Sequence, residues 1–327
     1  MISTIDLSIV IVNYKTPRMT SECITSIWQY VEDIQLEIIV IDNHSQDNSK
    51  QYILTQHPYI IWIDMPYNAG FARANNEGIR LAQGKYILLL NSDTLLIDNS
   101  ILKCIRTLEE RLDTVAVSAI QLTPSLTPLL FYEGFNDYFQ RFFIVPLSCQ
   151  KYLTRWIKAS KYEDDQQVDW LVGAFFMVKK NAIQQVGMLD EDFFMYAEDV
   201  EWSYRLKKHG KLLLLKDCQF IHLEWGSNPE RKRKKFTYIN RFDPQIHLSN
   251  LVFIRKRFGI TAYIALMVYY WIMIPVVYMW KITENMTAKK RVFEDFENIN
   301  EFVNTIFIFN SFFFKIISGK PYLYKVP

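Results

Sequence analysis

The chain has 327 residues, which is more than one hydrophobic core usually holds, so we expect one main domain with an appendage. Half of the residues are hydrophobic and 15% are aromatic, enough to bury a large core. The formal net charge of +2 creates no global field that would attract nucleic acid, and we therefore expect no nucleic-acid partner.

The N-terminal apolar run Leu7–Val12 is short, follows no basic residues and ends at Asn13-Tyr14-Lys15. We interpret it as a buried strand and not as a signal peptide. The cysteines lie far apart, without the spacing of a disulfide framework or a zinc knuckle, so a reducing compartment is expected. They are Cys23, Cys104, Cys149 and Cys218.

Strand-like and helix-like segments alternate along the first part of the chain, which is typical of a parallel sheet covered by helices on both faces. The pattern predicts strands at 7–12, 37–41, 60–64 and 86–90, with helices at 19–31, 47–55 and 71–82.

Polar side chains follow each of these strands. Open sheets bind ligands beyond the carboxyl ends of their strands, so we expect these groups to converge on a nucleotide pocket. Taken singly, each is also an ordinary turn residue. The groups are Asn13-Tyr14, Asp42-Asn43, Asp64 and Asn91-Ser92-Asp93.

An acidic pair, Glu198-Asp199, stands between an aromatic cluster at 193–196 and a predicted helix. A carboxylate held there can deprotonate a hydroxyl. The alternative is a pair that only complements the dipole at a helix N-terminus. Before it, 168–178 is predicted to be a loop entering a buried strand, where Gly173 permits close backbone approach.

Two other segments have open interpretations. The irregular stretch 123–165 is expected to cover the site or shape an acceptor groove. Within it, 150–156 resembles the Gln-x-x-Arg-Trp motif of processive polysaccharide synthases, but its spacing and its place before the acidic pair disfavour that class. The basic run 231–235 faces either an anionic surface or solvent.

A charge-free segment extends from Gly259 to Trp280, between Arg255-Lys256-Arg257 and Lys281. It is long enough to span a bilayer, which takes about 20 residues. Its tyrosines and Pro275 equally fit an interfacial helix or a bent hairpin, and a packed helical pair or homodimer interface is the third alternative. The basic flanks, including 289–291, fit anionic lipid on the cytoplasmic face.

Five motifs, in this order, resemble those of the inverting family 2 glycosyltransferases with the GT-A fold. The similarity covers residues 7–250 and is greatest to the rhamnosyltransferase-like branch of bacterial surface polysaccharide assembly. The motifs are Ser8–Tyr14, Ile41–Asp47, Asn68–Gly78, Leu90–Asp93 and Phe194–Asp199.

The resemblance implies an α/β fold, with a Rossmann-like mixed sheet flanked by helices in a GT-A domain at 1–250. A hydrophobic helical appendage that associates with membrane or dimerises would follow at 251–327. It also implies that Asp42 contacts the nucleobase and that the loop at Gly70 lies beside the diphosphate, with Arg73 near a phosphate. The full set expected at the nucleotide-sugar is Asn13, Tyr14, Asp42, Asp64, Asn68, Gly70, Arg73 and Ser92.

By the same resemblance Asp93 binds Mn²⁺ or Mg²⁺, although Asn91 stands where many relatives have a first aspartate. His222 matches a histidine near the metal, or is structural. Asp199 matches the catalytic base, with Glu198 as its neighbour and an acceptor ligand.

For the acceptor, the resemblance implies that Trp170 stacks on a sugar ring beside Gly173, unless Trp170 belongs to the core. Charge alone suggests that Arg241 approaches a phosphate.

The implied reaction moves a sugar from a nucleotide-diphosphate donor to a lipid-linked or growing glycan at the cytoplasmic face of the cell membrane. The branch favours a dTDP-linked deoxysugar such as rhamnose. The protein would be peripheral or held by one C-terminal hairpin or span. A nucleotidyltransferase is disfavoured because 13–17 is not a glycine-rich phosphate loop. A non-catalytic scaffold is the other alternative.

Overall fold

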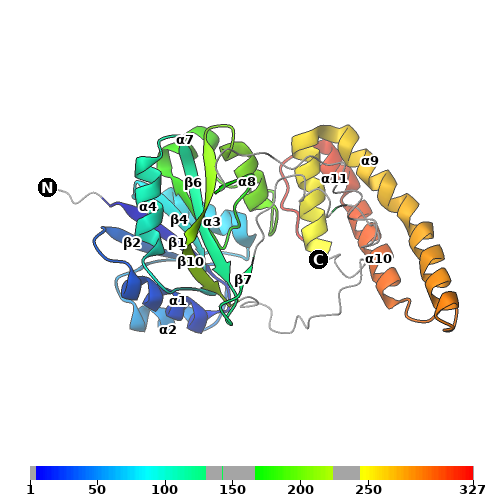
Figure 1. The fold of residues 1–327 in the computed structure, drawn as a ribbon, viewed down its shortest axis with the longest axis horizontal. Coiled ribbons are helices and arrows are strands. Elements are labelled where there is room, and N and C mark those ends of the chain that lie inside the picture. The colour runs from blue at the N-terminus through cyan, green and yellow to red at the C-terminus, as the bar shows by residue number, and fades with distance from the viewer. Residues whose placement is uncertain (1–4, 130–141, 143–165, 224–243, 327) are drawn as a thin grey trace. The chain divides into compact units, whose positions relative to one another are not determined.

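The computed structural model describes residues 5–129, 142, 166–223 and 244–326 (Figure 1). The chain forms two compact units. The first contains 1–137, 159–190 and 198–232, and the second contains 138–158, 191–197 and 233–327. The expected boundary at residue 250 falls inside helix α9 (Pro244–Thr287) of the second unit. The segments 150–156 and 231–235, Cys149, Arg241 and most of 123–165 lie outside the described residues, so the expectations for them stay predictions.

The first unit is built on a ten-stranded sheet in the order β3-β2-β1-β4-β9-β6-β10-β5, with β7 beside β6 and β8 beside β10. Strands β1 to β4 are parallel, which confirms the arrangement expected from the sequence. Strand β9 runs antiparallel between β4 and β6, so the whole sheet is mixed. The strands are β1 Leu7–Asn13, β2 Leu36–Asp42, β3 Ile61–Asp64, β4 Tyr86–Asn91, β5 Thr94–Leu96, β6 Thr114–Leu122, β7 Pro128–Leu129, β8 Gln167–Val168, β9 Phe175–Lys179 and β10 Lys211–His222.

Helices cover both faces of this sheet. Along β4, Leu88 packs on one face with α1, α2 and α4, whereas Leu89 packs on the other with α3, α7 and α8. Because both faces are buried, the central strands are continuous apolar runs, as the sequence shows. The helices are α1 Pro17–Tyr30, α2 Ser49–Gln56, α3 Gly70–Leu81, α4 Ser100–Glu110, α7 Lys180–Val186 and α8 Glu198–Leu206.

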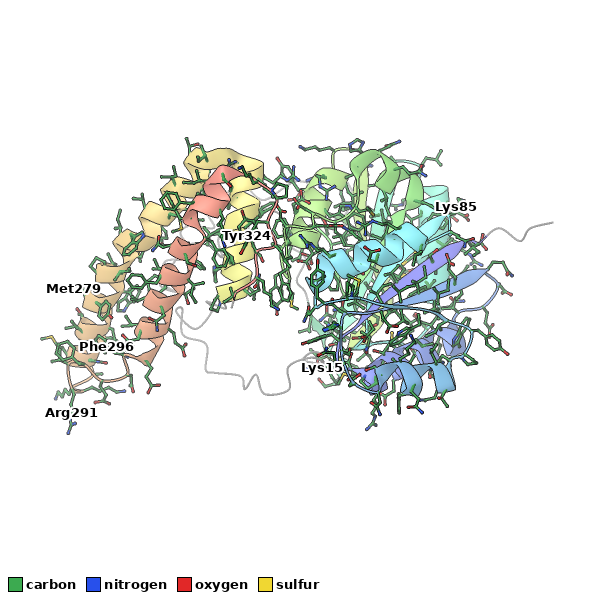
Figure 2. All side chains as sticks on the ribbon, turned by 180° about the vertical axis from the view of Figure 1, so that it is seen from behind. Lys15, Lys85, Met279, Arg291, Phe296 and Tyr324 are labelled. Carbon is green, nitrogen blue, oxygen red and sulfur yellow. The ribbon has the colours of Figure 1, made fainter. Side chains whose placement is uncertain are left out.

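The second unit is helical. Helices α10 (Glu297–Ser311) and α11 (Phe313–Ser318) pack against α9, which is interrupted at Gly259, where φ is 88°. Within the described part of the chain, α9 is the one helix that is long and apolar enough to cross a membrane, judged by length and composition alone. Figure 2 shows the turn around Arg291 at one end of this unit and Tyr324 at the other.

Candidate active site

The carboxyl ends of β1 to β4 lie together at one edge of the sheet. Asn13 of β1 is paired with Asp42 of β2, which is paired in turn with Asp64 of β3. On the other side of β1, Val12 is paired with Asn91 of β4. The strand order reverses between β1 and β4, and this reversal is the point at which open α/β sheets bind ligands.

Asp42 is the centre of a buried hydrogen-bonded network. Its Oδ1 accepts from Asn13 Nδ2 at 2.7 Å and from the Ser45 hydroxyl, and its Oδ2 accepts from the Ser45 N–H at 2.9 Å. These bonds fix the carboxylate and the turn that follows β2. The sequence interpretation missed Ser45, although an aspartate three residues before a serine is a common turn signal.

The loop before α3 is attached to β2 through Asn43. Its Nδ2 donates to Asn68 Oδ1 at 3.0 Å, and its Oδ1 accepts from the Ala69 N–H at 2.9 Å. Gly70 opens α3 with a φ of 83°, a conformation that glycine adopts without steric cost. The helix therefore presents its N-terminal N–H groups beside the strand ends, where they suit an anion.

Three other residues expected at the donor lie outside these networks. Tyr14 is half-buried directly after β1. Arg73, in the first turn of α3, donates from Nη1 to the Tyr67 hydroxyl at 3.1 Å. Asp64 is exposed on the outermost strand and forms an ion pair of 2.5 Å with Lys50. Asp64 thus lies at the rim of the strand-end region.

Asp93 and His222 meet beyond the ends of β4 and β10. Strand β10 is antiparallel to β5 with His222 opposite Thr94, which brings the imidazole Nε2 to 3.0 Å from Asp93 Oδ1. Nearby, the Ser92 hydroxyl lies 3.1 Å from the Thr16 hydroxyl at the start of α1. The structure therefore places Asp93, His222 and Ser92 in one region.

The chemistry of Asp93 and His222 fits a divalent cation. Carboxylate oxygen and imidazole nitrogen suit Mn²⁺, whereas Mg²⁺ prefers oxygen alone. Two nearby buried atoms, His222 Nδ1 and Asn91 Oδ1, have no hydrogen-bond partner among the described residues. Within those residues no group of three or more His, Cys, Asp or Glu could hold a metal. A bound cation would therefore take its remaining ligands from substrate oxygens and water.

Asp199 is linked to the end of β4 through the loop that enters β9. The Asn91 N–H donates to the Ala174 carbonyl at 3.0 Å, and the Gly173 N–H donates to Asp199 Oδ2 at 3.0 Å. Gly173 is tightly surrounded, since a Cβ there would lie 3.3 Å from the Phe71 ring. The acidic pair also opens α8, so it complements the helix dipole as well.

Glu198 differs from Asp199 in its surroundings. It is 5% exposed, and its Oε2 has no hydrogen-bond partner among the described residues. Burial raises the pKa of the Glu198 carboxyl well above its usual range, and the charge of Asp199 raises it further. Glu198 therefore favours the neutral acid and leaves the negative charge with Asp199.

A buried ion pair that the sequence interpretation missed anchors α8. Arg205 Nη2 donates to Glu201 Oε2 at 2.8 Å and to the Met188 carbonyl at 2.7 Å. Between these two residues along α8, the Ser203 hydroxyl accepts from the Leu171 N–H at 3.1 Å. The Glu-to-Arg spacing of four residues on a predicted helix is the signal that could have found this pair.

Trp170 lies shortly before Gly173, in the segment that enters β9. Its side chain is 5% exposed, so the protein already covers nearly all of the indole. This position fits the alternative that Trp170 belongs to the core, and stacking on an acceptor sugar stays a prediction.

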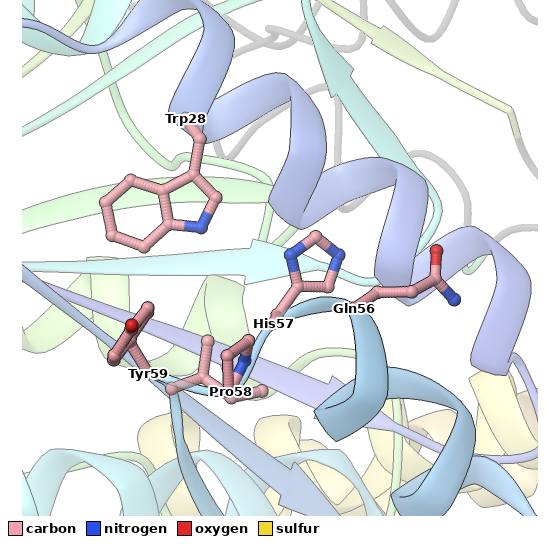
Figure 3. A pocket seen from close by; sticks show the side chains of 6 residues that line it. Trp28, Gln56, His57, Pro58 and Tyr59 are labelled. Carbon is pink, nitrogen blue, oxygen red and sulfur yellow. The ribbon is translucent and has the colours of Figure 1, made fainter.

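A pocket of about 500 Å³ lies away from these residues (Figure 3). Its lining includes Trp28 near the end of α1 and His57 after α2, both of which precede the amino ends of the next strands. The pocket is therefore at the edge of the sheet opposite the carboxyl ends of β1 to β4, which form the strand-end site. None of the residues expected to bind the donor lines it.

An open α/β sheet with polar side chains at its switch point and a carboxylate nearby can bind a ligand and remove a proton from a hydroxyl group, as a group-transfer enzyme requires. The model of the family described as Glycosyl transferase family 2 matches residues 8–187, more than half of the chain. The chain belongs to glycosyl transferase family 2 and is a glycosyltransferase.

Several glycosyltransferases and polysaccharide synthases resemble the chain at low identity. The low-salt glycan biosynthesis hexosyltransferase Agl10 of Haloferax volcanii is 27% identical over 71% of this chain and 71% of its own length. The poly-beta-1,6-N-acetyl-D-glucosamine synthase of Staphylococcus epidermidis is 25% identical over 61% of this chain, which spans only 45% of that enzyme.

Among solved structures, GalNAc-T7 with UDP, GalNAc and Mn²⁺ aligns with a TM-score of 0.52 and 14% identity, over 88% of this chain and 59% of its own. At this identity the likeness confirms the GT-A type of fold alone.

Proposed function

We propose that the protein transfers a sugar from a nucleotide-diphosphate donor to a hydroxyl group with inversion, in the biosynthesis of a glycan or polysaccharide. The observation that carries the proposal is the bond from Gly173 to Asp199, which holds a carboxylate beside the end of β4. Asp93 lies beyond the end of that same strand. The relatives are named as a glycan biosynthesis hexosyltransferase and a poly-N-acetylglucosamine synthase, and these names support a role in glycan or polysaccharide biosynthesis.

In this proposal the donor binds across the ends of β1, β2 and β4. Asp42 accepts a hydrogen of the nucleobase, and the loop at Asn68 and Gly70 offers N–H groups to the diphosphate. Tyr14, Arg73, Ser92 and the outlying Asp64 complete the expected donor contacts. Asp93 and His222 would hold Mn²⁺ or Mg²⁺, which when bound neutralises charge on the leaving diphosphate.

The chain's own contribution to the reaction is removal of a proton. The acceptor oxygen forms a bond to the anomeric carbon while the bond from that carbon to the diphosphate oxygen breaks. The electron pair leaves with the diphosphate, and the hydroxyl proton passes to Asp199. The raised pKa of Glu198 leaves Asp199 as the ionised member of the pair, which suits it to this role.

The acceptor would bind near Gly173, Glu198 and Trp170. A lipid-linked glycan and a deoxysugar donor such as dTDP-rhamnose are the finer forms of this proposal. The first is supported by the apolar helical unit, and the second by the resemblance of the motifs to the rhamnosyltransferase-like branch.

A screen of the full chain against a panel of nucleotide sugars with Mn²⁺, read by mass spectrometry, tests the function. The expected result is hydrolysis or transfer with one donor or a few related donors. Release of pyrophosphate from a nucleoside triphosphate and a sugar phosphate would instead indicate a nucleotidyltransferase. No turnover of any donor with added lipid extract would favour the scaffold.

We also propose that the helical unit contacts the cytoplasmic face of the cell membrane. Beyond Gly259, helix α9 exposes large apolar side chains spaced three or four residues apart, which places them along one side of the helix. Such a surface between basic flanks suits the boundary of an anionic membrane. This apolar stripe consists of Ile260, Ile264, Val268, Ile272, Val276 and Met279.

Val268→Glu is expected to reduce binding to membranes, because it puts a charge in the middle of the apolar stripe. Val268 is 51% exposed, so the folded unit should tolerate the change. Met286→Glu is the matched control, since Met286 is 63% exposed on the same helix, beyond Trp280 and among charged residues. Vesicle flotation measures the effect. Unchanged flotation combined with loss of a dimer would assign the stripe to a homodimer interface.

A further inference from the structure

The helical unit contains a pocket of about 370 Å³ that the proposed reaction does not use. It lies between the first part of α9, the end of α11 and the segment that ends the chain. Tyr324, labelled in Figure 2, belongs to its wall. Its polar and charged lining consists of Asp192, Arg255, Lys256, Ser318, Lys320 and Tyr324.

Arg255 has unused hydrogen-bonding capacity in this pocket. Its Nη2 donates to the Ile317 carbonyl at 3.2 Å, whereas its buried Nε has no acceptor among the described residues. A buried N–H of a charged guanidinium without an acceptor is unfavourable. An anion in the pocket could supply the missing acceptor.

The charges around the pocket do not balance. Among the described residues of the lining, Asp192 is the one carboxylate, and it already accepts from Lys256 Nζ at 2.7 Å and from the Tyr322 N–H at 2.9 Å. The described lining carries a formal charge of +2, because Asp192 offsets only one of the three cations Arg255, Lys256 and Lys320. The pocket therefore favours a compact ligand of negative charge.

We propose that this pocket binds a phosphate group. A guanidinium and ammonium groups match phosphate oxygens in charge and hydrogen bonding. The exposed side chains of Phe258 and Phe314 lie within about one helical turn of Arg255 and Ser318, which favours the headgroup of a lipid as the source of the phosphate. The choice of a lipid as the source of the phosphate rests on the proposed membrane contact. The proposal that the pocket binds phosphate rests on its charged lining alone.

Lys320→Gln tests the proposal, with Lys325→Gln as the matched control. Both lysines are exposed in the same terminal segment, but only Lys320 lines the pocket. We expect Lys320→Gln to weaken binding of the full chain to vesicles of phosphatidylcholine with phosphatidylglycerol about fivefold, and Lys325→Gln to change it less than about twofold. Arg255→Gln should weaken binding at least as much as Lys320→Gln.

Calorimetric titration with inorganic phosphate separates the two sources. Phosphate binding that Lys320→Gln removes, with vesicle binding unchanged, would support the pocket and assign it to a soluble phosphate. Equal losses in both lysine variants would reduce the effect to general surface charge and overturn the proposal. The proposal would also be overturned if Lys320→Gln bound both vesicles and inorganic phosphate as the unmodified chain does. Sugar transfer to a soluble acceptor, measured in parallel, reports separately on the proposed reaction.

Discussion

Replacement of Asp199 by asparagine is expected to lower kcat for sugar transfer by about 10²- to 10⁴-fold, the range that a general base contributes. The amide oxygen can still accept from the Gly173 N–H, so α8 and its loop should stay in place. The amide cannot take the proton of the acceptor hydroxyl. KM for the donor should therefore change little, and steady-state transfer measured by mass spectrometry with saturating donor checks both values.

Glu198→Gln is the matched control for this variant. Since burial and the charge of Asp199 favour the neutral acid at Glu198, glutamine resembles the form already present. Activity should stay within about tenfold of the unmodified enzyme. The opposite result, with Asp199→Asn fully active and Glu198→Gln inactive, would move the base to Glu198.

Removal of divalent cations with a chelator is expected to stop transfer, and Mn²⁺ is expected to restore it. Asp93→Asn should lower kcat about 10²- to 10³-fold, the loss typical when one group that stabilises developing charge is removed. It should also raise the Mn²⁺ concentration needed for half-maximal rate, because a carboxylate ligand is replaced by a neutral amide. Initial rates over a Mn²⁺ titration measure both effects.

Asp113→Asn controls for the loss of a carboxylate. Asp113 precedes β6, is 58% exposed and pairs with Lys211 at 2.8 Å, at the edge of the sheet opposite the strand-end site. This variant should keep the activity and the Mn²⁺ dependence of the unmodified enzyme.

Full turnover of the unmodified enzyme in the presence of chelator would contradict the metal prediction and exclude Asp93 as a metal ligand.

The sequence predicts the donor side of the fold well because each signal there is local. The strands of this half are apolar runs that end in polar residues such as Asn13 and Asp42. Parallel strands in register then bring those residues to one edge without further information.

Other features depend on contacts that are distant in sequence. Strand β10 shifts register between Leu215 and Gln219 before it reaches His222 beside Asp93, and nothing in the apolar pattern of that strand reveals the shift. The interruption of α9 at Gly259 is similar. The charge-free segment predicts a helix from this residue onward, but the structure begins the helix at Pro244 and turns it at the glycine.

The pairing of β4 with the antiparallel β9 joins two stretches of chain with different tasks. The residues expected to recognise the nucleotide extend no further than Ser92. Asp199 and the loop that holds it come after Gln166, and the loop is joined to the end of β4 by the bond from Asn91 to Ala174 and by the pairing with β9. Substitutions in this loop would therefore change the contacts expected with the acceptor and leave Asn13 and Asp42 in place at the ends of β1 and β2.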